Sequence, residues 1–469
     1  MGLKPRVDNA VPTPATTTLP RSVIARFSIG SLGTGGFGTL PGLVLIYFLT
    51  DTLGVTAALA GLIILVAKIW DVLIDPIIGD ISDASARKTG TRARLMTLGA
   101  IFLPIFFFAT FAVPGQLHGL PAALWVLFMF IACATAFSMF QVPYIALPAE
   151  LTPNYDERTR LLTWRVVILS AAILAFGGGG PILRSLGGDN ERLGYIIMAL
   201  VAGAIIGIGF IIAARVAPRN TPDPTAPSPL RALRLRETLK HYTTGIELLK
   251  TNQPFRVLLA TFFLQALATG MMLAGAQYVA KWVLNSEAAI TNIFVALIAP
   301  ALLMAPVWGN ISAKIGKEKS FMYASIIFMA GALMMTALLI APGPWIYLPV
   351  ALCGAAYAGM QSLPMAMLPD TITHATHNNK DSQAGIYGGV WTAGETTGMA
   401  LGSTALTIVL ALTGYIESLH NETVTQPDSA VTGIILAFSI IPAAAILISL
   451  FALRTYPLRK HDIDNAVTQ

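Results

Sequence analysis

The residues best suited to chemistry in this sequence are three ionisable side chains within one apolar stretch, Lys68-Ile-Trp-Asp71-Val-Leu-Ile-Asp75-Pro76. Lys68 and Asp71 are three residues apart, and Asp71 and Asp75 are four apart. In a helix these spacings place all three side chains on one face, with neighbours about 5–6 Å apart. Two carboxylates this close could ligate a Na⁺ ion or share a proton, with Lys68 as the counter-charge when no cation is bound.

A membrane setting would make these charges expensive. Each ionisable residue costs about 2.5–3.5 kcal/mol at the centre of a membrane helix, and three facing lipid would cost on the order of 8–10 kcal/mol. The charged face is therefore predicted to line a water-filled cavity between helices. Pro76 lacks an amide hydrogen and would free a backbone carbonyl beside the pair. The alternative is a buried Lys–Asp pair that only fixes helix packing.

Other polar residues lie in apolar stretches and are weaker candidates. Ser138, Gln141 and Tyr144 share one stretch, Arg165 opens the next, and Gln361 and Glu395 lie in two later ones. A lone glutamate in a membrane helix is a functional hypothesis by default. Hydrogen-bonded packing explains Gln361 equally well, and Arg165 could instead extend its charge to the membrane interface.

The composition indicates that these stretches are membrane helices. The chain has 469 residues, of which 55% are hydrophobic and only 12% charged, and its mean hydropathy is +0.69. A soluble domain is typically about 25% charged. The composition therefore excludes a soluble enzyme, a disordered chain and a nucleic-acid-binding domain. The apolar runs are continuous rather than alternating, which predicts helices and not a barrel.

Twelve apolar runs can be counted, six on each side of a polar stretch. The predicted fold is an all-α polytopic membrane protein with twelve transmembrane helices in two six-helix bundles. The expected spans are 23–50, 54–82, 95–114, 120–149, 162–185, 193–216, 254–283, 288–313, 319–341, 345–369, 383–414 and 431–454. The expected parts are a flexible N-terminal tail (1–22), a first bundle (23–216), a basic proline-rich linker (217–252), a second bundle (253–455) and a C-terminal tail (456–469).

Two further patterns concern orientation and symmetry. Lys and Arg gather in the loops on the side of the two termini, which predicts that both termini are cytoplasmic. Gly79-Asp-Ile-Ser-Asp83 lies between the second and third spans, and Gly309-Asn-Ile-Ser-Ala-Lys314 lies at the same place in the second half. Two matching halves around a central site are the architecture of many secondary transporters.

Two long motifs point to a family. They are Trp70-Asp71-x-x-x-Asp75-Pro76-x-x-Gly79-x-x-x-Asp83 followed by a basic loop, and Pro143-Tyr144-x-Ala146-Leu147 followed by Glu150-Leu-Thr152 and Asp156-Glu-Arg-Thr-Arg-Leu161. The chain resembles the glycoside–pentoside–hexuronide:cation symporters, the melibiose permease-like branch of the major facilitator superfamily. The resemblance implies the major facilitator fold and a symporter that couples Na⁺ or H⁺ to a solute by alternating access.

The resemblance also implies roles for single residues. The cation site would consist of Asp71 and Asp75, with Ser138 and Lys68 nearby, and any bound metal would be Na⁺ at the two aspartates. The residues expected to form a cytoplasmic gate are Asp83, Arg87, Lys88, Arg92 and Arg94. The residues expected at the solute site are Gly35, Gln141, Tyr144, Arg165, Gln361 and Glu395.

The chain departs from the family at the sugar site. Gly35 and Gln141 stand where the family has sugar-binding aspartates, Gln361 replaces an aromatic platform, and Glu395 replaces a lysine. We expect a sugar or glycoside with a different hydrogen-bond pattern. An amphiphile such as a lysophospholipid is the alternative, since the glycines of residues 30–38 would remove bulk from the cavity wall.

The remaining expectations concern partners and class. We expect a monomer in a bacterial inner membrane that contacts solute, coupling cation and membrane lipid, binds no nucleic acid and needs no cofactor beyond the cation. A sensor that binds a ligand without moving it would keep the same charged stripe and is the alternative from another class. An intramembrane enzyme is disfavoured, because the sequence has no metal-ligand cluster or nucleophile–base pair.

Overall fold

The computed structural model describes residues 18–152, 155–219, 221, 247–286, 288–378, 384–418 and 424–458. Within these residues, twelve helical stretches are long and apolar enough to cross a membrane. The predicted fold class is confirmed. Most of the two tails and of the linker lies outside the described residues, so the expectations for them stay predictions.

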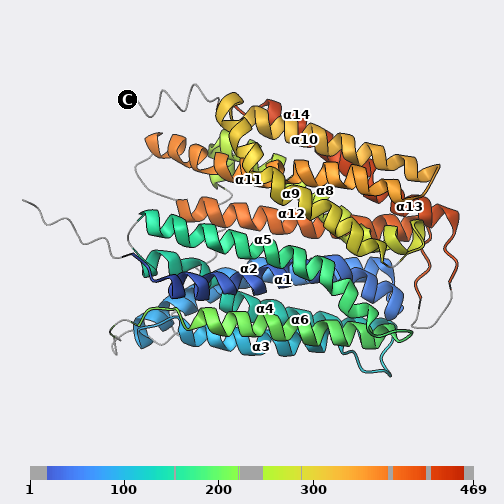
Figure 1. Cartoon of the computed structure of the whole chain (residues 1–469), viewed down its shortest axis with the longest axis horizontal. Coiled ribbons are helices and arrows are strands. Elements are labelled where there is room, and N and C mark those ends of the chain that lie inside the picture. The colour runs from blue at the N-terminus through green and yellow to red at the C-terminus, as the bar shows by residue number, and fades with distance from the viewer. Residues whose placement is uncertain are drawn as a thin grey trace, which may run out of the picture.

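The helices fall into two groups that Figure 1 shows as a blue-to-green half and a yellow-to-red half. The first half contains α1 (Arg21–Tyr47), α2 (Ala57–Thr89), α3 (Ala93–Phe111), α4 (Gly119–Leu151), α5 (Tyr155–Ser185) and α6 (Glu191–Ala214). The second half contains α8 (Gln253–Tyr278), α9 (Ala289–Ile315), α10 (Lys317–Met334), α11 (Tyr347–Asn378), α12 (Ala384–Leu412), α13 (Asp428–Phe438) and α14 (Ile440–Arg454). The first helix of each half continues into a π-helical turn, Phe48–Thr52 after α1 and Val279–Val283 after α8.

The last span differs from its prediction. The run 431–454 was expected to be one helix, but the chain breaks at Ser439, whose φ and ψ are −128° and −79°. Pro442 supplies the reason, because it has no amide hydrogen to bond the carbonyl four residues earlier, at Phe438. The span is therefore built from two helices, α13 and α14.

The packing of the two halves repeats. In the first half, α1 packs on α5 and α6, α3 on α4 and α6, and α2 on α4. In the second half, α8 packs on α12 and α14, α10 on α11 and α14, and α9 on α11. The halves meet where α2 contacts α12, where α5 contacts α9 and where α1 contacts α8. Each contact thus has a counterpart related by the repeat, as the matching Gly79 and Gly309 segments suggested.

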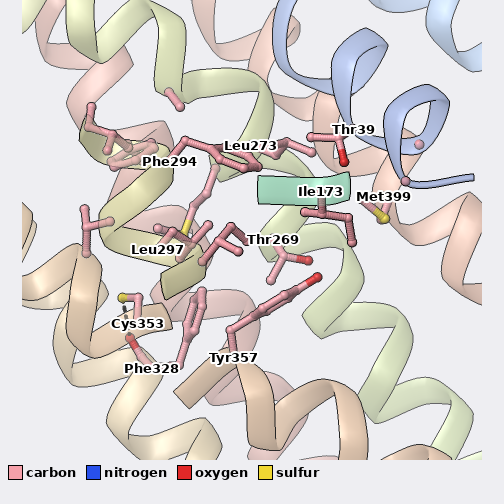
Figure 2. A pocket seen from close by; sticks show the side chains of 18 of the residues that line it. Thr39, Ile173, Thr269, Leu273, Phe294, Leu297, Phe328, Cys353, Tyr357 and Met399 are labelled. Atoms are coloured by element: carbon pink, nitrogen blue, oxygen red, sulfur yellow. Dashed lines mark hydrogen bonds between the residues drawn. The ribbon is translucent and has the colours of Figure 1, made fainter. Parts of the chain in front are cut away.

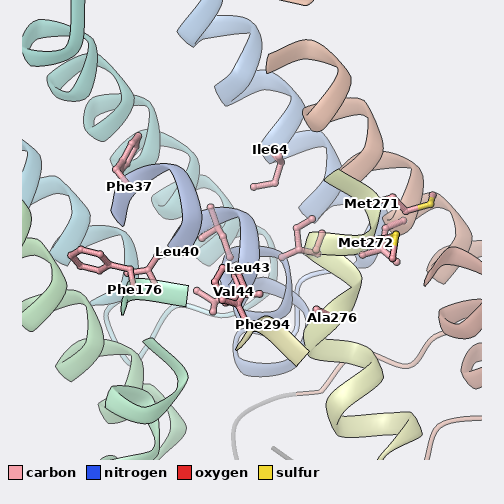
Figure 3. Packing of buried hydrophobic residues seen from close by; sticks show 14 of the residues in the cluster. Phe37, Leu40, Leu43, Val44, Ile64, Phe176, Met271, Met272, Ala276 and Phe294 are labelled. Carbon is pink, nitrogen blue, oxygen red and sulfur yellow. The ribbon is translucent and has the colours of Figure 1, made fainter. Parts of the chain in front are cut away.

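Apolar side chains of both halves form one continuous cluster around the α1–α8 contact (Figure 3). Two glycines let helices of opposite halves approach closely. A Cβ added to Gly177 in α5 would lie 2.0 Å from the Phe294 ring of α9, and a Cβ added to Gly61 in α2 would lie 2.0 Å from Thr407 Oγ1 of α12. The two halves therefore approach each other at positions where any side chain would have to displace a residue of the opposite half.

Polar contacts between the halves gather at the end of the bundle away from the chain termini, which we call the distal end. Ser418 N donates to Thr50 O at 3.1 Å, and Ala57 N donates to Glu417 Oε1 at 2.8 Å. Lys281 Nζ lies 3.4 Å from Glu191 Oε1. The structure therefore represents a state whose halves are sealed to each other at the distal end.

Candidate functional site

The three predicted charges of α2 lie on one face of the helix, as their spacing required. Lys68 Nζ is 3.4 Å from Asp71 Oδ2, and the two side chains are 34% and 15% exposed. The indole Nε1 of Trp70 donates to Thr135 Oγ1 of α4 at 2.9 Å, which fixes α2 against its neighbour. The Lys68–Asp71 pair is thus partly exposed.

Asp75 faces α4. Its carboxyl group interacts with Ser138, Asp71 and Lys68, so the residues that the family resemblance assigned to a cation site lie together. The Ser138 side chain is fully buried, and its hydroxyl lies within reach of the Asp75 carboxyl group. The hydroxyl oxygen keeps lone pairs and could therefore ligate a cation held between α2 and α4.

The donor set suits a small cation. Two carboxylates and a hydroxyl offer only oxygen atoms, which are the ligands that hard cations prefer. Among the described residues, no cluster of three or more His, Cys, Asp and Glu side chains is found, so the site offers two carboxylates and a hydroxyl. Such a set can bind Na⁺ or hold a proton.

A cavity of about 340 Å³ lies between the two halves (Figure 2). Helices α1 and α5 of the first half and α8, α9, α11 and α12 of the second supply most of its wall. Two of the predicted solute-site residues, Gly35 and Glu395, line it, and Glu395 is the one charged residue in the described wall. Most of the other lining side chains are apolar, among them Ile173, Leu273 and Phe294.

Lys68, Asp71 and Asp75 are not among the residues that line this cavity. The expectation that the acids of α2 face water between the halves stays a prediction. Asp75 lies against Ser138 of α4, a neighbour that helical periodicity alone does not reveal.

Helix α4 links the cation residues to the cavity. Ser138, beside Asp75, precedes Gln141 by almost one helical turn, and Gln141 Oε1 accepts a hydrogen bond from Thr34 Oγ1 at 2.8 Å. Thr34 lines the cavity. A displacement of α4 on cation binding would therefore be transmitted through Gln141 and Thr34 to the cavity wall.

Besides Gln141, three predicted solute-site residues are not among the residues that line the cavity. Tyr144 is fully buried, and its hydroxyl donates to Phe27 O at 2.8 Å, so it packs α4 against α1. The Arg165 guanidinium lies 5.5 Å from the centre of the Tyr144 ring, which is cation–π distance. Gln361 Nε2 donates to the Tyr357 hydroxyl at 2.9 Å, and Tyr357 is the residue that reaches the cavity.

The expected effect of the glycines of residues 30–38 holds at one position. A Cβ added to Gly33 would lie 2.0 Å from the Phe210 ring, and one added to Gly35 would lie 2.8 Å from Ala172 Cβ, so these glycines allow close helix packing. Gly30 and Gly36 are similarly crowded, whereas Gly38 has no atom within 4 Å of an added Cβ and lines the cavity.

Two of the five predicted gate residues, Asp83 and Arg92, form ion pairs within the first half. Arg92 Nη1 lies 2.6 Å from Asp83 Oδ1, and Arg92 Nε lies 2.6 Å from Glu150 Oε1. Burial alone would lower the pKa of Arg92, but its hydrogen bonds and charge contacts with Glu150 and Asp83 raise that pKa overall. Arg87, Lys88 and Arg94 are exposed. The gate role of all five stays a prediction.

Sequence reasoning missed Asp51 at the distal seal. This residue lies in the π-helical turn after α1 and is 3% exposed. It accepts hydrogen bonds from the Tyr415 hydroxyl and Thr50 Oγ1, each at 2.6 Å. The sequence signal for Asp51 is an acidic residue directly after an apolar run, where a loop is expected.

Comparisons with known proteins agree with this geometry. The family model for the MFS/sugar transport protein family matches residues 26–460, nearly the whole chain. The chain belongs to the MFS/sugar transport protein family. As members of that family are transporters, the chain is a membrane transporter and not an enzyme.

Several relatives of this MFS transporter carry informative names. It is 22% identical to the glucuronide carrier protein homolog of Escherichia coli, over 93% of this chain and 92% of that protein. It is 21% identical to sodium-dependent lysophosphatidylcholine symporter 1 of Xenopus tropicalis, over 92% of this chain and 86% of that protein. The structure of a D-xylose–proton symporter matches with a TM-score of 0.65 and 13% identity, covering 93% of this chain and 98% of that one, and so supports the fold.

Proposed function

We propose that this transporter is a symporter that couples entry of a small organic solute to inward movement of Na⁺ or H⁺ by alternating access. The observation that carries the proposal is the arrangement of Asp71, Asp75 and the buried hydroxyl of Ser138 between α2 and α4. Lys68 pairs with Asp71 and would offset the negative charge when the cation has left. The names of relatives, which include symporters of sodium and of protons, support the same proposal.

The proposed cycle follows from the two ends of the bundle. At the distal end the halves are joined by hydrogen bonds and an ion pair. At the opposite end, Arg92 pairs with Asp83 and Glu150, and Lys317 pairs with Asp370, each pair within one half. With the termini cytoplasmic, as the basic loops predict, the structure corresponds to a state closed on the side away from the cytoplasm, and release of cation and solute in this state would be to the cytoplasm.

Two solute classes fit the family. The family description and the glucuronide carrier homolog support a sugar or glycoside. The apolar wall of the cavity favours the second candidate, an amphiphile, because a sugar needs several hydrogen-bonding groups to replace its water. The lysophosphatidylcholine symporter among the relatives supports this candidate too.

Uptake into proteoliposomes tests the proposal. The purified protein is reconstituted, and a panel of radiolabelled methyl glycosides, sugars and lysophosphatidylcholine is offered under an inward gradient of Na⁺, Li⁺ or H⁺. We expect one gradient to drive accumulation of at least one solute above its external concentration. Solute counterflow without accumulation under any gradient would overturn coupling, and binding without counterflow would identify a sensor.

A further inference from the structure

The cavity between the halves joins one acidic group to an apolar enclosure. Glu395, on α12, is partly exposed to it, and in the described part of the chain no basic side chain forms an ion pair with this carboxylate. Removing a carboxylate from water is costly unless an opposite charge or a proton compensates. Within the described residues, the Glu395 carboxylate at the cavity therefore has no ion-pair partner.

The rest of the wall suits a cation with an apolar body. Phe294, Phe328, Phe438 and Tyr357 contribute aromatic rings, and ring faces attract ammonium groups as well as apolar surface. Tyr357 lies near Glu395, and Figure 2 shows its hydroxyl and that of Thr269 close to each other at the cavity. An ammonium group beside Glu395 would thus meet a carboxylate, an aromatic ring and hydroxyl oxygens together.

We propose that the transported solute is an organic cation, an ammonium group on an apolar body, with Glu395 as its counter-ion. This inference rests on the proposed function and narrows its solute class. Thr269 and Tyr357 would orient the ammonium group, and apolar residues of α5, α8 and α9 would enclose the body. A neutral sugar would leave the Glu395 charge uncompensated.

A pair of matched probes tests this inference without any transport assay. Phenylbutylamine and phenylbutanol share one apolar body and differ in a terminal ammonium or hydroxyl group. Binding of each to the purified full chain in lipid nanodiscs is measured by isothermal titration calorimetry, with methyl galactoside as the sugar probe. We expect the amine to bind at least tenfold more tightly than the alcohol, and methyl galactoside to bind more weakly than either.

Variants assign the preference to one residue. Glu395→Gln should abolish the tenfold difference by weakening the amine and leaving the alcohol unchanged, since it removes only the charge. Asp428→Asn, an exposed carboxylate at the start of α13, should keep the wild-type preference. The bound alcohol also shows that the Glu395→Gln variant is folded.

Three results would overturn the inference: equal affinity for amine and alcohol, an unchanged preference in Glu395→Gln, or tighter binding of methyl galactoside than of the amine. These results do not touch the cation coupling of the α2 site, which gradient-driven accumulation tests separately. A transporter that couples Na⁺ to a sugar would still accumulate its solute under a gradient but would show no preference for the amine over the alcohol. A sensor for organic cations would prefer the amine but show no counterflow.

Discussion

Helices α2 and α9 occupy equivalent places in the two halves and differ in charge. Both contain the sequence Pro-x-x-Gly-x-Ile-Ser, at residues 76–82 and 306–312, and each contacts a helix of the opposite half. In that register the α2 residues Lys68, Asp71 and Asp75 correspond to Ile298, Ala301 and Ala305 of α9. Because α9 packs in the equivalent place with apolar residues at these positions, helix packing does not require the charges of α2. Function explains these charges better than folding does.

The comparison of α2 with α9 also suggests different roles for the two halves. The first half holds Asp71 and Asp75, the latter against Ser138 of α4, whereas Ile298, the α9 counterpart of Lys68, belongs to the apolar cavity wall. In the proposed function, cation binding would therefore belong to the first half, and most of the solute enclosure to the second. The hydrogen bond between Thr34 and Gln141 connects the two regions.

The largest expected effect comes from removing an acid on α2. Asp75→Asn should abolish gradient-driven accumulation in proteoliposomes, because the neutral amide cannot compensate a bound cation. The matched control is Ala305→Asn, which puts the same side chain at the equivalent exposed position of α9 and should leave accumulation within about twofold of wild type. Loss in both variants, or in neither, would break the comparison of the two helices.

A glycine pair tests the contact between the halves. Gly177→Ala places a methyl group against the Phe294 ring, where overpacking costs about 1–3 kcal/mol, and should shift the protein toward a state open at the distal end. Gly179→Ala, two residues on, meets no atom within 4 Å and should shift nothing.

The readout for this pair is a distance between spin labels. Labels at Gln116→Cys and Thr425→Cys, exposed distal residues of opposite halves, report the separation by electron paramagnetic resonance. The native Cys133 and Cys353 are free but buried and should not take up label. A longer distance in Gly177→Ala is expected, and the same distribution in both glycine variants would contradict the sealed-end interpretation.

Ser138→Ala tests the third oxygen of the cation site. If Na⁺ is the coupling ion, the loss of one ligand should raise the Na⁺ concentration for half-maximal uptake about tenfold, which corresponds to about 1.4 kcal/mol. Maximal uptake should change little, since both aspartates remain. An unaltered Na⁺ dependence in a sodium-coupled protein would remove Ser138 from the site.

The smallest expected effect lies at Asp51. Tyr415→Phe removes one hydrogen bond to this buried carboxylate, which is typically worth about 0.5–1.5 kcal/mol, and should increase the distal-open population severalfold. Tyr323→Phe, at a side chain that is 48% exposed on α10, is the control. The same pair of spin labels measures both variants, and equal distributions would show that the Asp51 bond does not hold the seal.

The sequence predicted the spans to within a few residues for most helices, because the thickness of the hydrocarbon core sets the length of each apolar run. It also predicted which α2 residues share a face, since that follows from helical geometry. The break at Ser439 was readable from Pro442 and was overlooked. The neighbour of Asp75 came from the family resemblance and not from helical geometry. The burial of Tyr144 and the seal at Asp51 could not be predicted, because they depend on how helices pack and not on the period of any one of them.

The most direct test of the central claim measures cation binding without any solute. Thermal unfolding of the purified protein is followed in Na⁺, in Li⁺ and across pH, for wild type and for the Asp71→Asn, Asp75→Asn double variant. A ligand that binds only the folded state stabilises it by RT ln(1 + [L]/Kd). We predict a concentration-dependent rise in Tm with Na⁺ or with H⁺ in the wild type and no such rise in the double variant. An equal rise in both proteins would place the coupling cation elsewhere and contradict the account.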